Sequence, residues 1–102
     1  EEETDLSKID FSMEMFTAFV RGMALNRSVF TDEEIDSLSL GPVYMPFLHG
    51  LRAYTDFLLG NVYYQVAYAD QNLDRARSLF HFAQLAREHE PAMQKILRDN
   101  FI

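Results

Sequence analysis

The sequence predicts an all-α protein, with about five helices arranged as an irregular helical bundle. Apolar residues recur at i, i+3, i+4 and i+7 along most of the chain, which is the spacing of one helix face. Helix-start residues and Gly or Pro residues separate these segments from one another. With 102 residues, the chain has the length of a single domain, and we expect residues 1–102 to form one helical unit.

The first two predicted helices have recognisable starting residues. Asp10 or Ser12 can cap a helix that ends near Asn26. Its apolar face consists of Phe16, Phe19, Val20 and Met23. Thr31 followed by Glu34 forms a capping box, which predicts a short second helix over 32–38. Acidic residues in its first turn favour the positive end of the helix dipole, so they need no metal to explain them.

The third, fourth and fifth helices are separated by Gly and Pro. Gly41-Pro42 starts the third helix, and Gly60 suits the position just after its end. Residues 61–70 alternate weakly like a strand, but a lone strand has no partner, so a loop or helical turn is expected. Asp70 or Asn72 caps the fourth helix, and Pro91 separates it from a short last helix. We expect the helices to bury one shared core: Phe16, Phe19, Leu48, Leu51, Leu58, Leu79 and Ala83.

Composition excludes several classes of protein. The net charge of −7 argues against a nucleic-acid partner, because phosphates attract Lys and Arg. No uncharged run is long enough for a membrane span. The absence of cysteine removes thiolate chemistry and makes a cytoplasmic location the simplest expectation.

Motifs for catalysis and metal binding are absent from the sequence. His49, His81 and His89 lack the spacing of metal ligands, and no Gly-rich phosphate loop or nucleophile elbow is present. We therefore predict no catalytic residue and no metal ligand in this chain. Nine Phe, five Tyr and five Met are many for such a small interior. Either they form a dense aromatic core, or an aromatic and Met-rich face is exposed for a partner.

The segment GLRAYTDFLLGNVYY, residues 50–64, contains the strongest candidate site. Arg52 and Asp56 are four residues apart, so they can form an ion pair on one helix face. From the residues alone, a surface ion pair that stabilises the helix is the favoured interpretation, and part of a binding site is the alternative. The segment NLDRAR, residues 72–77, leaves a similar choice for Arg75 and Arg77, for which organising the helix start is the favoured interpretation.

Three stretches of the sequence, taken together and in order, resemble one protein family: EEETDLSK, GLRAYTDFLLGNVYY and NLDRARSLFHFAQ. The chain resembles the C-terminal part of sugar kinases with the aminoglycoside-phosphotransferase and choline-kinase fold, in the branch similar to N-acetylhexosamine 1-kinase. The resemblance implies a fragment of a longer kinase chain that uses ATP and Mg²⁺. It also places the catalytic and Mg²⁺-binding aspartates upstream of the first stretch, so we expect the isolated chain to be inactive.

The resemblance assigns roles to three residues of the middle stretch. It implies that Arg52 contacts hydroxyl groups of the acceptor sugar and that Tyr63 lines the sugar pocket, while Asp56 would hold the Arg52 guanidinium. The family stretch has Asp where Asn61 stands and often Phe where Tyr64 stands, which leaves the identity of the sugar open. The expected partners are the missing N-terminal kinase lobes or a second copy of the chain. The alternative function is a free-standing helical interaction or dimerisation module.

Overall fold

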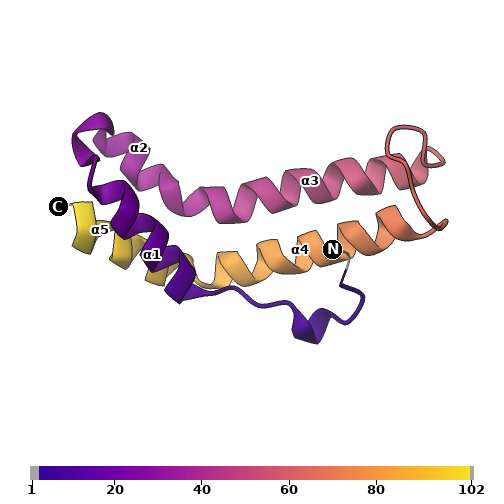
Figure 1. Cartoon of the computed structure of the whole chain (residues 1–102), viewed down its shortest axis with the longest axis horizontal. Helices are drawn as coiled ribbons and strands as arrows, with labels where there is room; N and C mark the ends of the chain where they lie inside the picture. The colour runs from indigo at the N-terminus through magenta and orange to yellow at the C-terminus, as the bar shows by residue number, and fades with distance from the viewer. Residues whose placement is uncertain (1–2, 102) are drawn as a thin grey trace.

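The computed structural model describes residues 3–101 as an all-α fold built around one long helical hairpin (Figure 1). The α-helices are α1 (Met13–Ala24), α2 (Asp32–Ser37), α3 (Gly41–Leu58), α4 (Gln71–Glu88) and α5 (Glu90–Phe101). Short 3₁₀ turns occupy Leu6–Lys8, Arg27–Val29 and Leu38–Leu40. Figure 1 shows α3 and α4 side by side along the long axis, with α1, α2 and α5 gathered at one end. The first two residues of the EEETDLSK stretch lie outside the described part of the chain.

The helix boundaries agree with the local sequence signals. Ser12 caps α1, since its hydroxyl accepts a hydrogen bond from the Met15 backbone N–H. Thr31 and Glu34 form both hydrogen bonds of the predicted capping box. Caps of this kind stabilise a helix by about 1 kcal/mol. The predicted second helix is therefore confirmed, although its last turn passes into 3₁₀ geometry at Leu38.

The break between α4 and α5 also follows the prediction. Pro91 lies in the first turn of α5, where a missing backbone N–H costs no helical hydrogen bond. The break itself falls at His89, whose backbone N–H still bonds to carbonyls of α4. Between α3 and α4, residues 59–70 form an irregular loop without strand geometry, as expected.

The core lies at the end of the molecule where α1 crosses α4 and α5 (Figure 1). Met93 and Leu97 of α5 and Val20 of α1 are fully buried there. The complete cluster of buried residues is Phe11, Phe16, Val20, Ala86, Met93, Leu97 and Phe101. Of the predicted core, Phe16 and Ala83 are buried and Leu79 is half-buried.

The prediction was wrong for Phe19 and for the leucines of the third helix. Phe19, Leu48, Leu51 and Leu58 are exposed. The buried face of α3 consists of Gly50, Ala53 and Asp56. The opposite face of α3 carries the large apolar residues. Apolar spacing identified a real stripe on α3, but that stripe points outward.

Small residues let α3 and α4 approach closely. Ala76 and Ala83 are buried on α4, the helix that packs along α3, and Gly50 of α3 faces Leu79 and Phe80 between them. A Cβ atom added at Gly50 would lie 2.7 Å from Cε1 of Phe80 and 3.3 Å from Cβ of Leu79. Carbon atoms prefer about 3.5–4.0 Å, so a larger residue at this point would require the Phe80 ring to turn and the helices to move slightly apart.

The resulting molecule is elongated. It measures 48 × 27 × 18 Å, and its radius of gyration is 16.1 Å. A compact domain of this length would have a radius of gyration of about 13 Å. The hairpin of α3 and α4 projects from the core (Figure 1).

Candidate functional site

The tip of the hairpin holds a groove that contains all the site residues predicted from sequence. Its volume is about 470 Å³, and it is formed by the end of α3 and the first part of the following loop. Its lining residues are Leu51, Arg52, Thr55, Asp56, Leu59, Val62, Tyr63 and Tyr64. Arg52, Asp56 and Tyr63, which are separated in sequence, therefore line one concave surface.

The loop leaves α3 through two residues of left-handed geometry. Gly60 has φ of 92° and Asn61 has φ of 62°. Gly adopts this geometry without strain, and Asn is among the few other residues that tolerate it. The Asn61 backbone N–H donates to the Asp56 carbonyl oxygen at 2.8 Å, and its side-chain amide donates to the Ala69 carbonyl oxygen at 3.2 Å. Asn61 thus connects the start of the loop both to α3 and to the last residues of the loop.

Asp56 is the anchor of this loop. Its side chain is only 4% exposed. One carboxylate oxygen accepts from the Tyr63 backbone N–H at 2.7 Å. The other accepts from the Tyr64 backbone N–H at 3.0 Å and from the Asn72 side-chain amide at 2.8 Å.

The expected pairing of Asp56 with Arg52 is not formed. The Asp56 carboxylate is turned inward to the loop and to α4, and Arg52 has no ion-pair partner among residues 3–101. The physical reason is that a buried carboxylate needs several directed donors, and three converge on Asp56 from the loop and α4. The role predicted for Asp56, holding the guanidinium, is therefore wrong.

The hydrogen bonds favour the charged form of Asp56. Burial by itself raises the pKa of a carboxyl group, because it disfavours charge. Here the burial effect is outweighed by the backbone N–H groups of Tyr64 and Tyr63 and by the Asn72 amide, so the pKa of Asp56 is lowered. A carboxylate that stays ionised and has its oxygens occupied by donors is a poor general base.

Asn72 joins the loop to α4. It is completely buried, and its amide donates both to Asp56 and to the Asn61 side-chain oxygen, the latter at 3.1 Å. Its own side-chain oxygen accepts from the Arg75 guanidinium at 3.1 Å. Asn72 was one of two candidates for the N-cap of the fourth helix, but it lies within α4 and Asp70 precedes the helix instead. Its side chain turns away from the helix end because the buried Asp56 needs a donor.

Two tyrosines and Arg75 form the outer part of the site. The rings of Tyr63 and Tyr64 meet edge to face with centroids 4.9 Å apart. The Arg75 guanidinium lies over the Tyr64 ring, 5.5 Å from its centroid, a distance at which cation–π attraction operates. Arg75 thus organises the start of α4 and the loop, as the favoured interpretation of NLDRAR expected. Arg77 is exposed on α4.

Arg52 and Tyr63 are the groups that remain open to a ligand. Arg52 is exposed at the groove, and Tyr63 is 72% exposed. A guanidinium offers five N–H donors, and a tyrosine offers a ring face and a hydroxyl group. Together they can donate hydrogen bonds to a polar ligand and pack a ring against its apolar side. Sequence reasoning missed Asn61 and Asn72 as organisers of the site, because Asn72 is distant in sequence from both of its acceptors, Asp56 and Asn61.

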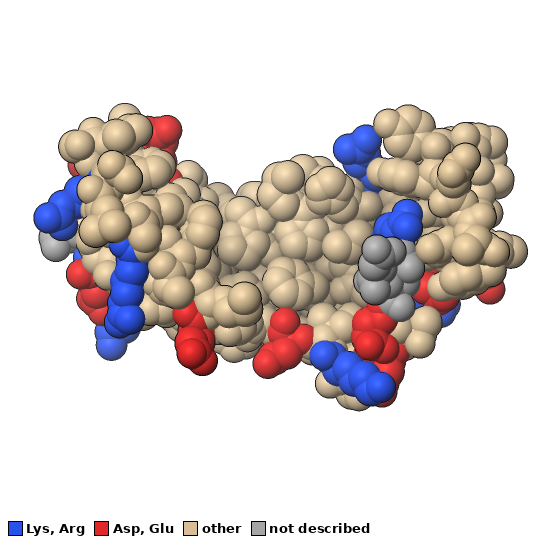
Figure 2. Space-filling model, in the orientation of Figure 1, with Lys and Arg blue, Asp and Glu red and all other residues tan. Residues whose placement is uncertain are grey.

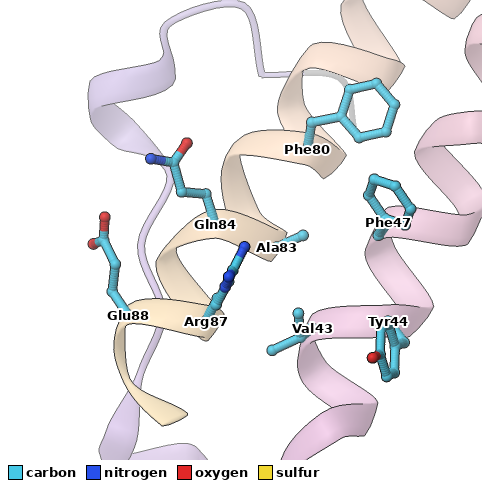
Figure 3. Close-up of a pocket in the computed structure, with 8 residues that line it drawn as sticks. All are labelled: Val43, Tyr44, Phe47, Phe80, Ala83, Gln84, Arg87 and Glu88. Carbon is cyan, nitrogen blue, oxygen red and sulfur yellow. The ribbon is translucent and has the colours of Figure 1, made fainter.

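A larger groove lies between α3 and α4, away from the hairpin tip (Figure 3). Its volume is about 780 Å³, and Figure 3 shows the rings of Phe47 and Phe80 next to each other at one end of it, with centroids 5.7 Å apart. Val43, Tyr44 and Ala83 extend its apolar lining, and Gln84, Arg87 and Glu88 on α4 complete it. This groove is lined mainly by apolar side chains and contains none of the site residues predicted from sequence.

The described part of the chain shows neither a metal centre nor a membrane span. Within residues 3–101, no three His, Asp or Glu side chains gather so as to hold a metal ion. No helix in that part is both long enough and apolar enough to cross a bilayer. A comparison with models of known protein families gave no match.

Proposed function

We propose that this chain is the C-terminal helical part of a cytoplasmic sugar kinase with the aminoglycoside-phosphotransferase and choline-kinase fold, similar to N-acetylhexosamine 1-kinases. In the proposed function, the groove at the hairpin tip binds the acceptor sugar. The observation that supports it most is that Arg52 and Tyr63 line this one groove and keep their polar groups available. The three-stretch sequence resemblance supplies the family.

The chemistry of the groove suits a monosaccharide. Arg52 donates several hydrogen bonds from a planar fork, which fits neighbouring sugar hydroxyl groups. Tyr63 presents a ring face to the apolar C–H side of a sugar and a hydroxyl group to its edge. The volume of about 470 Å³ falls within the usual size of small-ligand pockets. Leu51, Leu59 and Val62 add an apolar wall.

The phosphoryl-transfer step is proposed to occur on residues outside this chain. Such a step needs a phosphate cradle, Mg²⁺ ligands and a group that orients the attacking hydroxyl. Asp56 does not fill the last role, since its two oxygens accept hydrogen bonds from the loop and from Asn72. ATP and Mg²⁺ would therefore bind to the rest of the kinase, and the chain alone would be inactive.

The outer face of α3 is the proposed contact with that rest of the kinase. Tyr44, Met45, Phe47, Leu48, Leu51, Tyr54, Leu58 and Leu59 are each at least 40% exposed on or just after this helix. At about 200 Å² for a fully exposed side chain, eight side chains about half exposed amount to on the order of 800 Å². This is about what one partner contributes to a standard protein interface. Figure 2 shows a broad uncharged surface across the middle of the hairpin.

The test is steady-state kinetics on the full-length kinase with N-acetylglucosamine as acceptor. Arg52→Ala should raise the acceptor KM about tenfold or more, because one to two charge-assisted hydrogen bonds are lost. The nucleotide KM should stay unchanged. Arg98→Ala, an exposed arginine on α5 at the opposite end of the molecule, is the matched control. An Arg52→Ala variant with the acceptor KM of the wild type would refute the proposal.

The second candidate function is a free-standing helical module that dimerises or binds a partner. The observation that favours it is the same exposed apolar face of α3. Sedimentation equilibrium of the isolated chain, with Leu48→Glu as the disrupting variant, distinguishes the two. A tight dimer that Leu48→Glu dissociates, in a protein without kinase activity, favours the module.

A further inference from the structure

The hydrogen-bond network behind the groove has a consequence for ligand binding. Tyr63 is exposed and lies on a loop, and its ring contacts that of its neighbour Tyr64, which lies on the same loop. The loop backbone is held directly behind it: the N–H groups of Tyr63 and Tyr64 both point at the Asp56 carboxylate. Asp56 sits one helical turn after Arg52 on α3. The carboxylate therefore sets the distance between the loop that carries Tyr63 and the helix that carries Arg52.

We infer that Asn72 and Asp56 are positioning residues, which fix Tyr63 opposite Arg52 so that both can contact one sugar. This inference rests on the proposed function of the groove. Neither residue offers a free polar atom to a ligand, because the oxygens of Asp56 and the amide of Asn72 are bonded to each other, to Asn61, to Arg75 and to the loop backbone. They act through the loop.

Asn72 is the decisive member of this pair. Its amide carries two hydrogen bonds, one to the carboxylate on α3 and one to Asn61 at the start of the loop. Its side-chain oxygen accepts a hydrogen bond from the Arg75 guanidinium, which also lies over the Tyr64 ring next to Tyr63. One buried side chain thus connects α3, the loop and α4. An aliphatic side chain at this position would leave a buried carboxylate with one donor fewer and would remove one of the acceptors of Arg75.

Apart from this network, the hydrogen bonds of the loop lie toward its two ends, from Asn61 to Ala69 and from Ala67 to Gln71. Val62 and Tyr63 are largely exposed, so few apolar contacts restrain this part of the chain. Segments with few buried contacts open locally at low free-energy cost. Weakening the Asn72 network should therefore free the loop while the α1–α5 core, at the other end of the molecule, stays folded.

The test combines amide exchange with kinetics. In the isolated chain, Asn72→Ala should speed hydrogen exchange of the Tyr63 and Tyr64 amides by about tenfold or more, while amides of Met93 and Leu97 in α5 keep their protection. In the full-length kinase it should raise the N-acetylglucosamine KM about tenfold, with kcat and nucleotide KM within about twofold of wild type. A loss of folded protein would instead lower kcat, so the KM effect separates positioning from stability.

A milder variant guards against misfolding. Asn61→Gly keeps the left-handed backbone but removes the side-chain bonds to Asn72 and Ala69, so it should show a smaller effect of the same kind. Asn26→Ala, an exposed residue that makes no side-chain capping bond, is the matched control for Asn72→Ala and should change neither quantity.

The outcomes separate the two proposals. If Asn72→Ala speeds exchange of the Tyr63 and Tyr64 amides but leaves the sugar KM unchanged, the positioning role is wrong. If exchange of these amides is unchanged, Asn72 does not hold the loop. If the wild-type kinase phosphorylates no hexosamine, the proposed function fails, and the exchange rates of Tyr63 and Tyr64 still decide whether Asn72 holds the loop.

Discussion

Replacing Gly50 by Ala tests the close approach of α3 and α4, on which the geometry of the hairpin depends. The added Cβ would lie 2.7 Å and 2.8 Å from two ring atoms of Phe80 and 3.3 Å from Cβ of Leu79. The Phe80 ring is half-buried and borders the larger groove, so it can turn away. The Leu79 Cβ is fixed by the backbone, so the helices must separate by a few tenths of an ångström.

One favourable and two unfavourable terms set the change in the free energy of unfolding. Ala is favoured over Gly in a helix interior by about 1 kcal/mol. Overpacking a tight contact costs about 1–3 kcal/mol. Turning the Phe80 ring also weakens its contact with Phe47, and such aromatic pairs contribute about 0.5–1.5 kcal/mol. The net expectation for Gly50→Ala is a loss of about 1 kcal/mol.

The assay is urea unfolding followed by circular dichroism, with Gly22→Ala as the control. Gly22 lies inside α1, and an added Cβ there would meet nothing within 4 Å. That substitution should therefore stabilise the protein by about 1 kcal/mol. The same chemical change at two helical glycines is thus expected to differ by about 2 kcal/mol. Equal stabilisation by both variants would refute close helix packing at Gly50.

Two further predictions concern the core and the buried carboxylate. Leu97→Ala removes a side chain that is 1% exposed and should lower the free energy of unfolding by about 2–5 kcal/mol. Leu25→Ala, at a position that is 86% exposed, should change it by less than about 0.5 kcal/mol in the same urea titration. Because the pKa of Asp56 is lowered in the folded state, its contribution to stability is fully present above about pH 5 and is lost as the pH falls through its folded pKa. The difference in urea midpoint between wild type and Asp56→Asn should therefore be largest at pH 7 and shrink below about pH 4; a difference that grows on acidification would contradict the hydrogen-bonded carboxylate.

Local chemistry predicted most helix boundaries. The Thr31–Glu34 capping box, the start at Gly41 and the left-handed Gly60 all depend on a few neighbouring residues, and the structure contains each of them. The break before Pro91 is of the same kind. Such signals are readable because the interactions that decide them are short-range.

The buried face of α3 was not predictable in this way. Periodicity predicts the stripe of large apolar residues to be the inner face. The inner face instead carries Gly50, Ala53 and Asp56, because small residues permit the close contact with α4. Which face is buried is decided by the partner helix, which spacing within one helix does not describe.

The candidate site was predicted in part for the same reason. Arg52, Asp56 and Tyr63 were selected from one segment, and they do line one groove. The four-residue spacing suggested an ion pair between Arg52 and Asp56, but Asp56 bonds to the loop and to Asn72, which lies sixteen residues further along the chain. No pattern within a single segment indicates a donor at that separation.

The most direct test of the central claim is phosphoryl transfer by the full-length wild-type protein. Purified enzyme would be incubated with Mg²⁺-ATP and N-acetylglucosamine, and sugar phosphate would be measured against a reaction without sugar. The account predicts sugar-dependent formation of a hexosamine phosphate and of ADP. Absence of phosphorylated product across a panel of hexoses and N-acetylhexosamines would contradict it.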